Sequence, residues 1–174
     1  MEHFRLIGHL DPTAVNSAVR EHEAHFEDET WRQSTPGTCH ADTRSLYLRM
    51  PSEISVHSIF HSLDISDKPL IKLPILQQSL YDVQQLLDRA LARVMIVRLK
   101  PWGFIKPHRD EGTYADATDR FHWCLTSNPE AFFVSAREMA QMAPGEVWWF
   151  DKHVEHAVKN GRSDRDHMIV DVWK

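Results

Sequence analysis

Two stretches of this chain carry hydrophobic residues at helical spacing. In residues 12 to 30, four apolar residues fall on one helical face: Val15, Ala18, Val19 and Phe26. In residues 75 to 91, five more recur at the same spacing: Leu76, Leu80, Val83, Leu87 and Leu91. Each stretch starts at or just behind a proline, and one apolar face behind a proline is typical of a helix that packs on a core. We therefore predict two amphipathic helices, the first with Asp11 as its N-cap.

The rest of the pattern indicates short strands. One is expected at residues 45 to 49. After the second helix, β-branched and aromatic runs alternate with turn pairs: Asn128-Pro129, Pro144-Gly145 and Asn160-Gly161. These runs predict strands at 94 to 99, 121 to 126, 132 to 135, 147 to 150, 154 to 159 and 167 to 173. Many short strands behind a helical section indicate a mainly β fold with flanking helices (α+β), a cupin-like jelly roll with the helices on one outer face.

The length and composition fit one domain. At 174 residues we expect a single domain over 1–174, with residues 1–92 supporting a functional core in 93–174. No apolar run approaches the roughly 18 residues of a membrane span, and the N-terminus has no signal-peptide core, so we expect a cytoplasmic protein. Cys39 and Cys124 are expected to be reduced thiols.

The charge balance limits the partners. The chain has 20 Lys and Arg against 25 Asp and Glu, a formal charge of −5, which disfavours a broad grip on a phosphate backbone. We expect a small-molecule substrate, with neither nucleic acid nor a membrane as partner. The sequence gives no indication of the oligomeric state.

Three His-x-Asp triplets are candidates for a metal site. His9-Leu10-Asp11 lies just before the first predicted helix, where Asp11 is better explained as a cap. A second triplet, from His40 to Asp42, lies in a polar loop with no second histidine at a comparable strand. His108-Arg109-Asp110 follows the apolar run that begins at Val94 and a Pro-Trp-Gly break, so rigid strand ends can hold its ligands. We favour this third triplet.

A second histidine and an arginine complete the pattern. His156 lies in an apolar strand segment and is favoured as the distal ligand over His153, which we expect to be exposed in a loop. Arg165 opens the last strand and is favoured over Arg162, which follows a turn. Two imidazoles and one carboxylate occupy one face of Fe(II) and leave positions for a cosubstrate and O2. An arginine beyond the last ligand can hold the far carboxylate of 2-oxoglutarate with both oxygens.

Strand alternation sorts the other candidates. In residues 120 to 125, Arg120, His122 and Cys124 share one face and three apolar residues share the other. If the apolar face packs between the sheets, the polar face lines a cavity. His122 could equally be a hydrogen-bonded core histidine and Arg120 a surface cation. The aromatic run from Trp148 to Phe150 is expected to serve core packing, because adjacent strand residues face opposite ways.

Five segments in the second half occur in a specific order and spacing. They are Arg98 to Asp110, Arg120 to His122, Pro144 to Asp151, His156 to Asn160 and Arg165 to Trp173. Together they resemble the aspartyl/asparaginyl β-hydroxylase family over about residues 93 to 173. The resemblance implies a double-stranded β-helix, Fe(II) and 2-oxoglutarate with O2, and hydroxylation of an unactivated C–H bond.

The resemblance also implies roles for individual residues. His108 and His156 would be metal ligands, Arg165 the partner of the 2-oxoglutarate C5 carboxylate, and Arg120 and His122 further residues of the cosubstrate pocket. The animal enzyme that names the family lacks a carboxylate at the position of Asp110. Bacterial relatives, including hydroxylases of free amino acids, have one, so this chain looks more like the bacterial branch.

Three functions follow as hypotheses. The first is hydroxylation of a free amino acid or an amino-acid-derived metabolite, with release of succinate and CO2. The second is hydroxylation of an Asp or Asn residue in a peptide or carrier-bound intermediate. The third is a non-catalytic cupin-like metal-binding or sensor protein, which the combined set of His108, Asp110, His156 and Arg165 disfavours.

Overall fold

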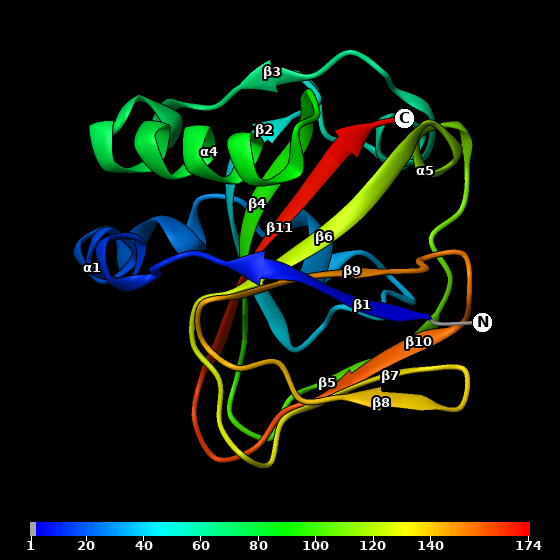
Figure 1. The fold of residues 1–174 in the computed structure, drawn as a ribbon. Coiled ribbons are helices and arrows are strands. Elements are labelled where there is room, and N and C mark those ends of the chain that lie inside the picture. Colours follow the sequence, from blue (N-terminus) through cyan, green and yellow to red (C-terminus); the bar gives the residue numbers. More distant parts are fainter. Residues whose placement is uncertain (1–2) are drawn as a thin grey trace.

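The computed structural model describes residues 3–174 and contains two antiparallel sheets. The larger has the strand order β1-β9-β6-β11-β4-β2-β3, and the smaller β5-β10-β7-β8. The strands of the larger sheet are β1 (Phe4–His9), β2 (Thr43–Met50), β3 (Ser66–Asp67), β4 (Leu91–Leu99), β6 (Thr118–Cys124), β9 (Glu146–Phe150) and β11 (Arg165–Trp173). Those of the smaller are β5 (Phe104–His108), β7 (Phe132–Ser135), β8 (Glu138–Ala140) and β10 (His156–Lys159). Figure 1 shows the smaller sheet below the strands of the larger one. The predicted jelly roll is confirmed.

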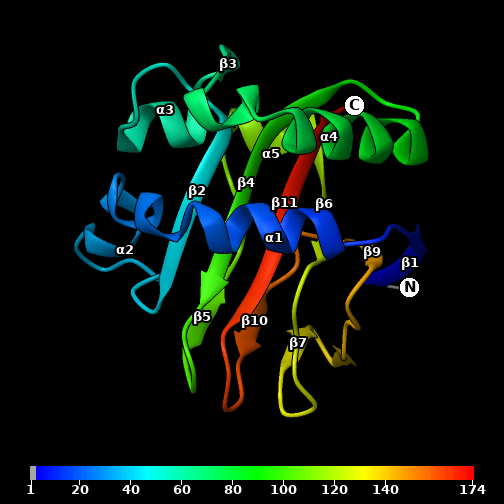
Figure 2. The same cartoon turned by 90° about the vertical axis from the view of Figure 1, so that its left-hand side faces the viewer.

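The two longest helices lie on one side of the larger sheet. The helices are α1 (Thr13–Glu21), α2 (Trp31–Ser34), α3 (Val56–His61), α4 (Pro74–Leu87) and α5 (Thr113–Ala117), with 3₁₀ turns η1 (Glu23–Glu27) and η2 (Pro69–Lys72). Figure 2 shows α1 and α4 crossing the outer face of the larger sheet. Among the described residues, no helix is long and apolar enough to cross a membrane.

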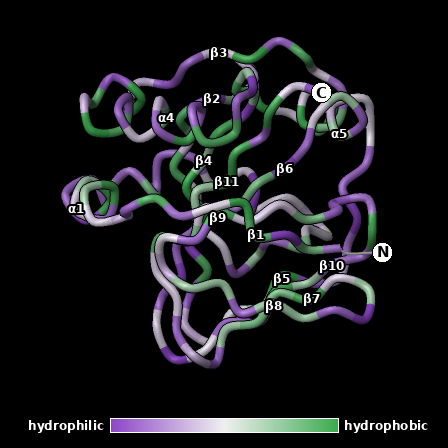
Figure 3. Tube along the Cα trace, viewed as in Figure 1, coloured by the Kyte–Doolittle hydropathy of each residue, from purple (hydrophilic) through white to green (hydrophobic). Residues whose placement is uncertain are grey.

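Two apolar layers make up most of the core, and a third, smaller cluster on β2, β4 and β11 contains Tyr47, Met95 and Ile169. The first lies between the helices and the larger sheet, where Val15 and Val83 pack against strand residues such as Trp123. The second lies between the two sheets and includes Phe133 and Phe150. Figure 3 shows hydrophobic positions along the strands and alternating character along α4. Because one sheet face is covered by helices, the other is left to line the space between the sheets.

The predicted elements differ from the observed ones at their ends. The first helix ends at Glu21 and continues as the 3₁₀ turn η1, so the predicted helix over 12–30 is too long. It begins at Thr13, which makes Pro12 the N-cap residue, although the Asp11 carboxylate still accepts the Thr13 amide at 3.0 Å. The second helix ends at Leu87, because Asp88 adopts a left-handed backbone (φ 49°) and Leu91 already belongs to β4.

The face assignment of β6 also needs one correction. Phe121 and Trp123 pack under the helices, not between the sheets. The opposite face, with His122 and Cys124, therefore points into the space between the sheets, where the His122 ring contacts Phe133 and Phe150 edge-on. The polar face lines the interior as predicted, but the reason is that the helices take the apolar face.

Candidate metal centre

Strand pairing brings the two favoured histidines together. His108 ends β5 and His156 begins β10, and the antiparallel register sets these two residues directly opposite each other. Their ring centroids are 4.2 Å apart. Asp110 follows two residues after β5, where its backbone N–H donates to the Lys152 carbonyl at 2.9 Å. One donor atom from each of His108, Asp110 and His156 lies within 4.8 Å of the others.

The backbone fixes which nitrogen each histidine presents. Nδ1 of His108 lies 2.8 Å from the Lys106 carbonyl oxygen, and Nδ1 of His156 lies 3.0 Å from the Val154 carbonyl oxygen. A carbonyl can only accept, so each Nδ1 carries the proton and each Nε2 keeps a free lone pair. Metal-binding histidines are commonly held in this way. The donor set therefore fits a divalent metal ion.

The protonation states agree with this arrangement. Burial lowers the pKa of His108, and it lowers the pKa of His156 to about 4, so both rings are neutral near pH 7. Burial alone would raise the pKa of Asp110, but the Arg120 guanidinium and the nearby histidines lower it to about 2. The site thus offers two neutral nitrogens and one anionic oxygen, the donor types of the 2-His-1-carboxylate site.

A buried network of ion pairs holds Asp110. Arg120 donates from Nη1 to Asp110 Oδ2 at 2.7 Å and from Nε and Nη2 to the two oxygens of Asp171 at 2.7 and 2.9 Å. Asp171 is fully buried and also accepts the Tyr114 hydroxyl at 3.0 Å. The role predicted for Arg120 in the cosubstrate pocket stays a prediction, and its guanidinium orients the carboxylate of Asp110. The unused oxygen of Asp110, Oδ1, lies 3.9 Å from His108 Nε2.

Arg165, unlike Arg120, is buried without a carboxylate partner among the described residues. It is 5 % exposed, and no carboxylate among residues 3–174 pairs with its guanidinium. Burial lowers its pKa to about 10, and its positive charge further lowers the pKa values of His122 and His167, which burial already holds well below their usual range. A buried unpaired cation is costly, and an anionic ligand would offset that cost. Arg162, by contrast, is exposed and pairs with Glu130.

Two histidines beside Arg165 have unused polar atoms. Nδ1 of His122 and both ring nitrogens of His167 are buried without a hydrogen-bond partner in the described chain. Their rings are 5.5 Å apart. His167 was missed in the sequence, although it shares a strand face with Arg165 two residues before it. Asp171 was missed as well, although a carboxylate between Val170 and Val172 on a buried strand signals a buried partner.

The alternative candidates from the sequence lie outside the metal centre. His153 is exposed, as expected. The Asp11 carboxylate accepts the Thr13 amide just before α1, and Asp42 binds Lys100 Nζ at 2.6 Å, so neither forms a His-Asp pair at the centre. The aromatic run divides between the layers, with Trp149 at the first and Trp148 and Phe150 at the second.

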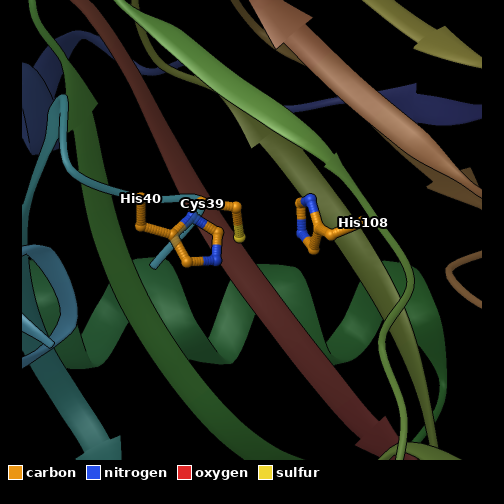
Figure 4. Close-up of side chains that lie close together, drawn as sticks. All are labelled: Cys39, His40 and His108. Atoms are coloured by element: carbon orange, nitrogen blue, oxygen red, sulfur yellow. The ribbon is translucent and has the colours of Figure 1, made fainter. Parts of the chain in front are cut away.

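A second group of donors shares one residue with the first. Figure 4 shows Cys39 and His40, from the loop before β2, beside His108. Their donor atoms also lie within 4.8 Å of one another. His108 has one free nitrogen, so it can serve only one ion at a time. The Arg32 guanidinium lies 3.1 Å from a His40 nitrogen, and this cation disfavours a metal ion there. The group with Asp110 is the better metal centre.

Comparison with known proteins agrees with the geometry. A profile described as "Aspartyl/Asparaginyl beta-hydroxylase" matches residues 21–174. The chain belongs to the aspartyl/asparaginyl β-hydroxylase family. Membership in this family makes it a 2-oxoglutarate- and Fe(II)-dependent oxygenase of the hydroxylase type. No curated protein matched the sequence.

Solved structures show the same fold for this hydroxylase. A Pseudomonas putida prolyl-4-hydroxylase is similar over 100 % of this chain and 94 % of its own, with TM-score 0.61 and 12 % identity. A collagen prolyl hydroxylase from Paramecium bursaria Chlorella virus-1 gives 0.57 and 12 %, over 99 % and 96 %. A 2OG-Fe(II) oxygenase family protein from Burkholderia pseudomallei gives 0.58 and 14 %, over 75 % of this chain and 66 % of its own. At these identities the likeness concerns the fold.

Proposed function

We propose that this hydroxylase acts on a free amino acid or an amino-acid-derived metabolite, with His108, Asp110 and His156 holding Fe(II) and Arg165 binding 2-oxoglutarate. The convergence of two neutral imidazole nitrogens and one carboxylate oxygen within 4.8 Å carries the proposal. Bound Fe(II) would activate O2 while 2-oxoglutarate is oxidised to succinate and CO2, and hydroxyl would be delivered to a substrate C–H bond.

The chain's own residues supply position and charge. The backbone carbonyls of Lys106 and Val154 orient the imidazoles. The ion pairs that link Asp171, Arg120 and Asp110 keep Asp110 ionised. The unpaired guanidinium of Arg165 suits the far carboxylate of a dicarboxylic acid, because a planar fork can bind both oxygens. His122 and His167 offer unused ring nitrogens beside it. Enclosure between the sheets would exclude water from the reacting groups.

The test measures conversion of 2-oxoglutarate to succinate with Fe(II), together with mass spectrometry of the added amino acid for a gain of one oxygen. His108→Ala and His156→Ala should abolish both signals. His153→Ala, an exposed histidine three residues from His156, is the matched control and should retain them. Normal turnover by His108→Ala would remove the proposed centre. A gain of oxygen on peptides alone would favour hydroxylation of a peptide residue instead.

A further inference from the structure

A cavity of about 460 Å³ opens beside the proposed metal ligands. His108, Asp110 and Arg120 lie on one side of it, and neither Arg165 nor His122 lines it. Its volume is within the range of small-molecule sites. Arg165 therefore lies outside this cavity, and the cavity is the place where a second small molecule could meet the proposed metal centre.

Most of the wall is apolar. Strands β2 and β4 and helices α2 and α3 contribute Trp31, Tyr47, Met50, Ile59, Phe60 and Met95. Such a wall favours a substrate that buries a hydrocarbon side chain. A strongly polar side chain placed against these six residues would lose its hydration with little compensation.

The Arg32 guanidinium at this cavity lacks a carboxylate partner among the described residues. The Arg32 guanidinium contacts Met95 Sδ at 3.3 Å and a His40 ring nitrogen at 3.1 Å, and no carboxylate of residues 3–174 pairs with it. Burial lowers the pKa of Arg32. A thioether is a weak acceptor and the imidazole engages only Nη2, so the guanidinium's capacity for a bidentate anion is unused.

The other buried arginines at the cavity are committed. Arg93 donates to the backbone carbonyls of Ser58, Ile59 and Ser62 at 2.8 to 3.1 Å, which anchors α3. Arg120 is held by its two carboxylates. Lys152 donates to the Thr118 hydroxyl at 2.7 Å, and Arg109 is exposed. Arg32 is thus the half-buried arginine of this cavity whose guanidinium is free to bind an anion.

Arg32 also lies close to the metal centre. Its guanidinium touches the His40 ring, and the His40 ring centroid is 5.1 Å from that of His108. Only one imidazole separates the cation from a proposed ligand. A molecule bound by its carboxylate at Arg32 would lie beside the proposed metal ligands, so a small substrate suffices.

We propose that Arg32 is a specificity-determining residue that binds the free carboxylate of a small substrate, whose apolar side chain packs against the wall of β2, β4 and α3. The substrate class is then a free carboxylic acid with a hydrocarbon side chain, such as an apolar amino acid. A residue inside a peptide has no free α-carboxylate and would bind poorly. This inference rests on the proposed function.

The test uses the visible absorption band that forms when 2-oxoglutarate chelates Fe(II) without oxygen. Apolar L-amino acids, each paired with its carboxamide, are titrated while the band is followed. The acids should perturb the band with at least tenfold lower Kd than their amides. Arg32→Gln should weaken binding of the acids at least tenfold, Arg32→Lys should weaken it less, and the unperturbed band should form normally in both.

Arg44→Gln is the matched control. Arg44 lies on β2 but is exposed outside the cavity and pairs with Glu27. The Arg44→Gln variant should bind the acids as the wild type does. Equal affinity for acids and amides, unchanged binding by Arg32→Gln, or no response to any acid while the band forms would overturn the inference and leave the proposed function intact. Failure of the band to form in the wild type would overturn both.

Discussion

At the scale of single residues, the centre depends on how charges are paired. Asp110 keeps one oxygen free because Arg120 holds the other, and Arg120 is itself fixed by the buried carboxylate of Asp171. Removing one partner of a buried ion pair is strongly destabilising, because the other charge is then left uncompensated. The partner of a ligand therefore matters for metal affinity almost as much as the ligand does.

Asp171→Asn should weaken this network of ion pairs. The amide loses the charge that holds Arg120, so Asp110 is less well oriented and we expect Fe(II) affinity to fall by about 10- to 100-fold. Anaerobic Fe(II) titration measures it. Asp166→Asn is the control, since Asp166 lies on the same strand and pairs with Arg98 at 2.8 Å. If both variants bind Fe(II) as the wild type does, the ion pairs of Arg120 have no part in metal binding.

Arg165→Met should separate stability from cosubstrate binding. The substitution removes a buried cation that has no carboxylate partner in the described chain, so the protein without cosubstrate should be at least as stable as the wild type. Stabilisation by 2-oxoglutarate, about 2.7 kcal/mol at a hundredfold excess over Kd, should be lost. Thermal unfolding with Mn(II), with and without 2-oxoglutarate, measures both. A preserved 2-oxoglutarate shift would assign the carboxylate to another group.

At the scale of elements, the centre is a product of strand register and one loop. Pairing of β5 with β10 sets His108 opposite His156, and the loop after β5 turns back to place Asp110. This loop continues to Gly112, whose φ of +96° favours glycine. A Cβ at Gly112 would lie 2.5 Å from the Phe60 carbonyl oxygen of α3.

Gly112→Ala should therefore disturb the loop that carries Asp110. We expect a loss of about 1 to 3 kcal/mol in the free energy of unfolding, together with weaker Fe(II) binding. Urea denaturation and Fe(II) titration measure the two effects. Gly37→Ala is the control, because Gly37 also has a positive φ of +78° but has nothing within 4 Å of its Cβ position. It should lose stability through backbone strain and keep its Fe(II) affinity. Equal Fe(II) affinities in the two variants would contradict this account.

At the scale of the whole molecule, the two faces of the larger sheet have different tasks. The helices α1 and α4 cover one face and supply much of the apolar core. The other face and the smaller sheet enclose the centre, with ligands from β5, β10 and the loop after β5. A metal ion held by His108, Asp110 and His156 would join neighbouring strands of the smaller sheet, away from α1 and α4.

Metal binding should therefore protect one part of the molecule selectively. We expect Mn(II) to slow hydrogen exchange at the amides of β5 and β10 and to leave α4 unchanged, because local opening of the smaller sheet would break the metal site. Exchange followed by mass spectrometry with and without Mn(II) checks this. Uniform slowing, or slowing confined to α4, would contradict the placement of the site.

The hydrophobic pattern alone determined that the protein has two outer helices and many short strands, and local chemistry singled out His108, Asp110, His156 and Arg165. These features are readable because periodicity, prolines and ligand spacing act over a few neighbouring residues. Tertiary structure decided the rest. Which face of β6 lines the interior depends on where the helices pack, and the partners of Arg120 and the freedom of Arg32 depend on residues distant in sequence. Pairing of charges in three dimensions, rather than any local motif, set those roles.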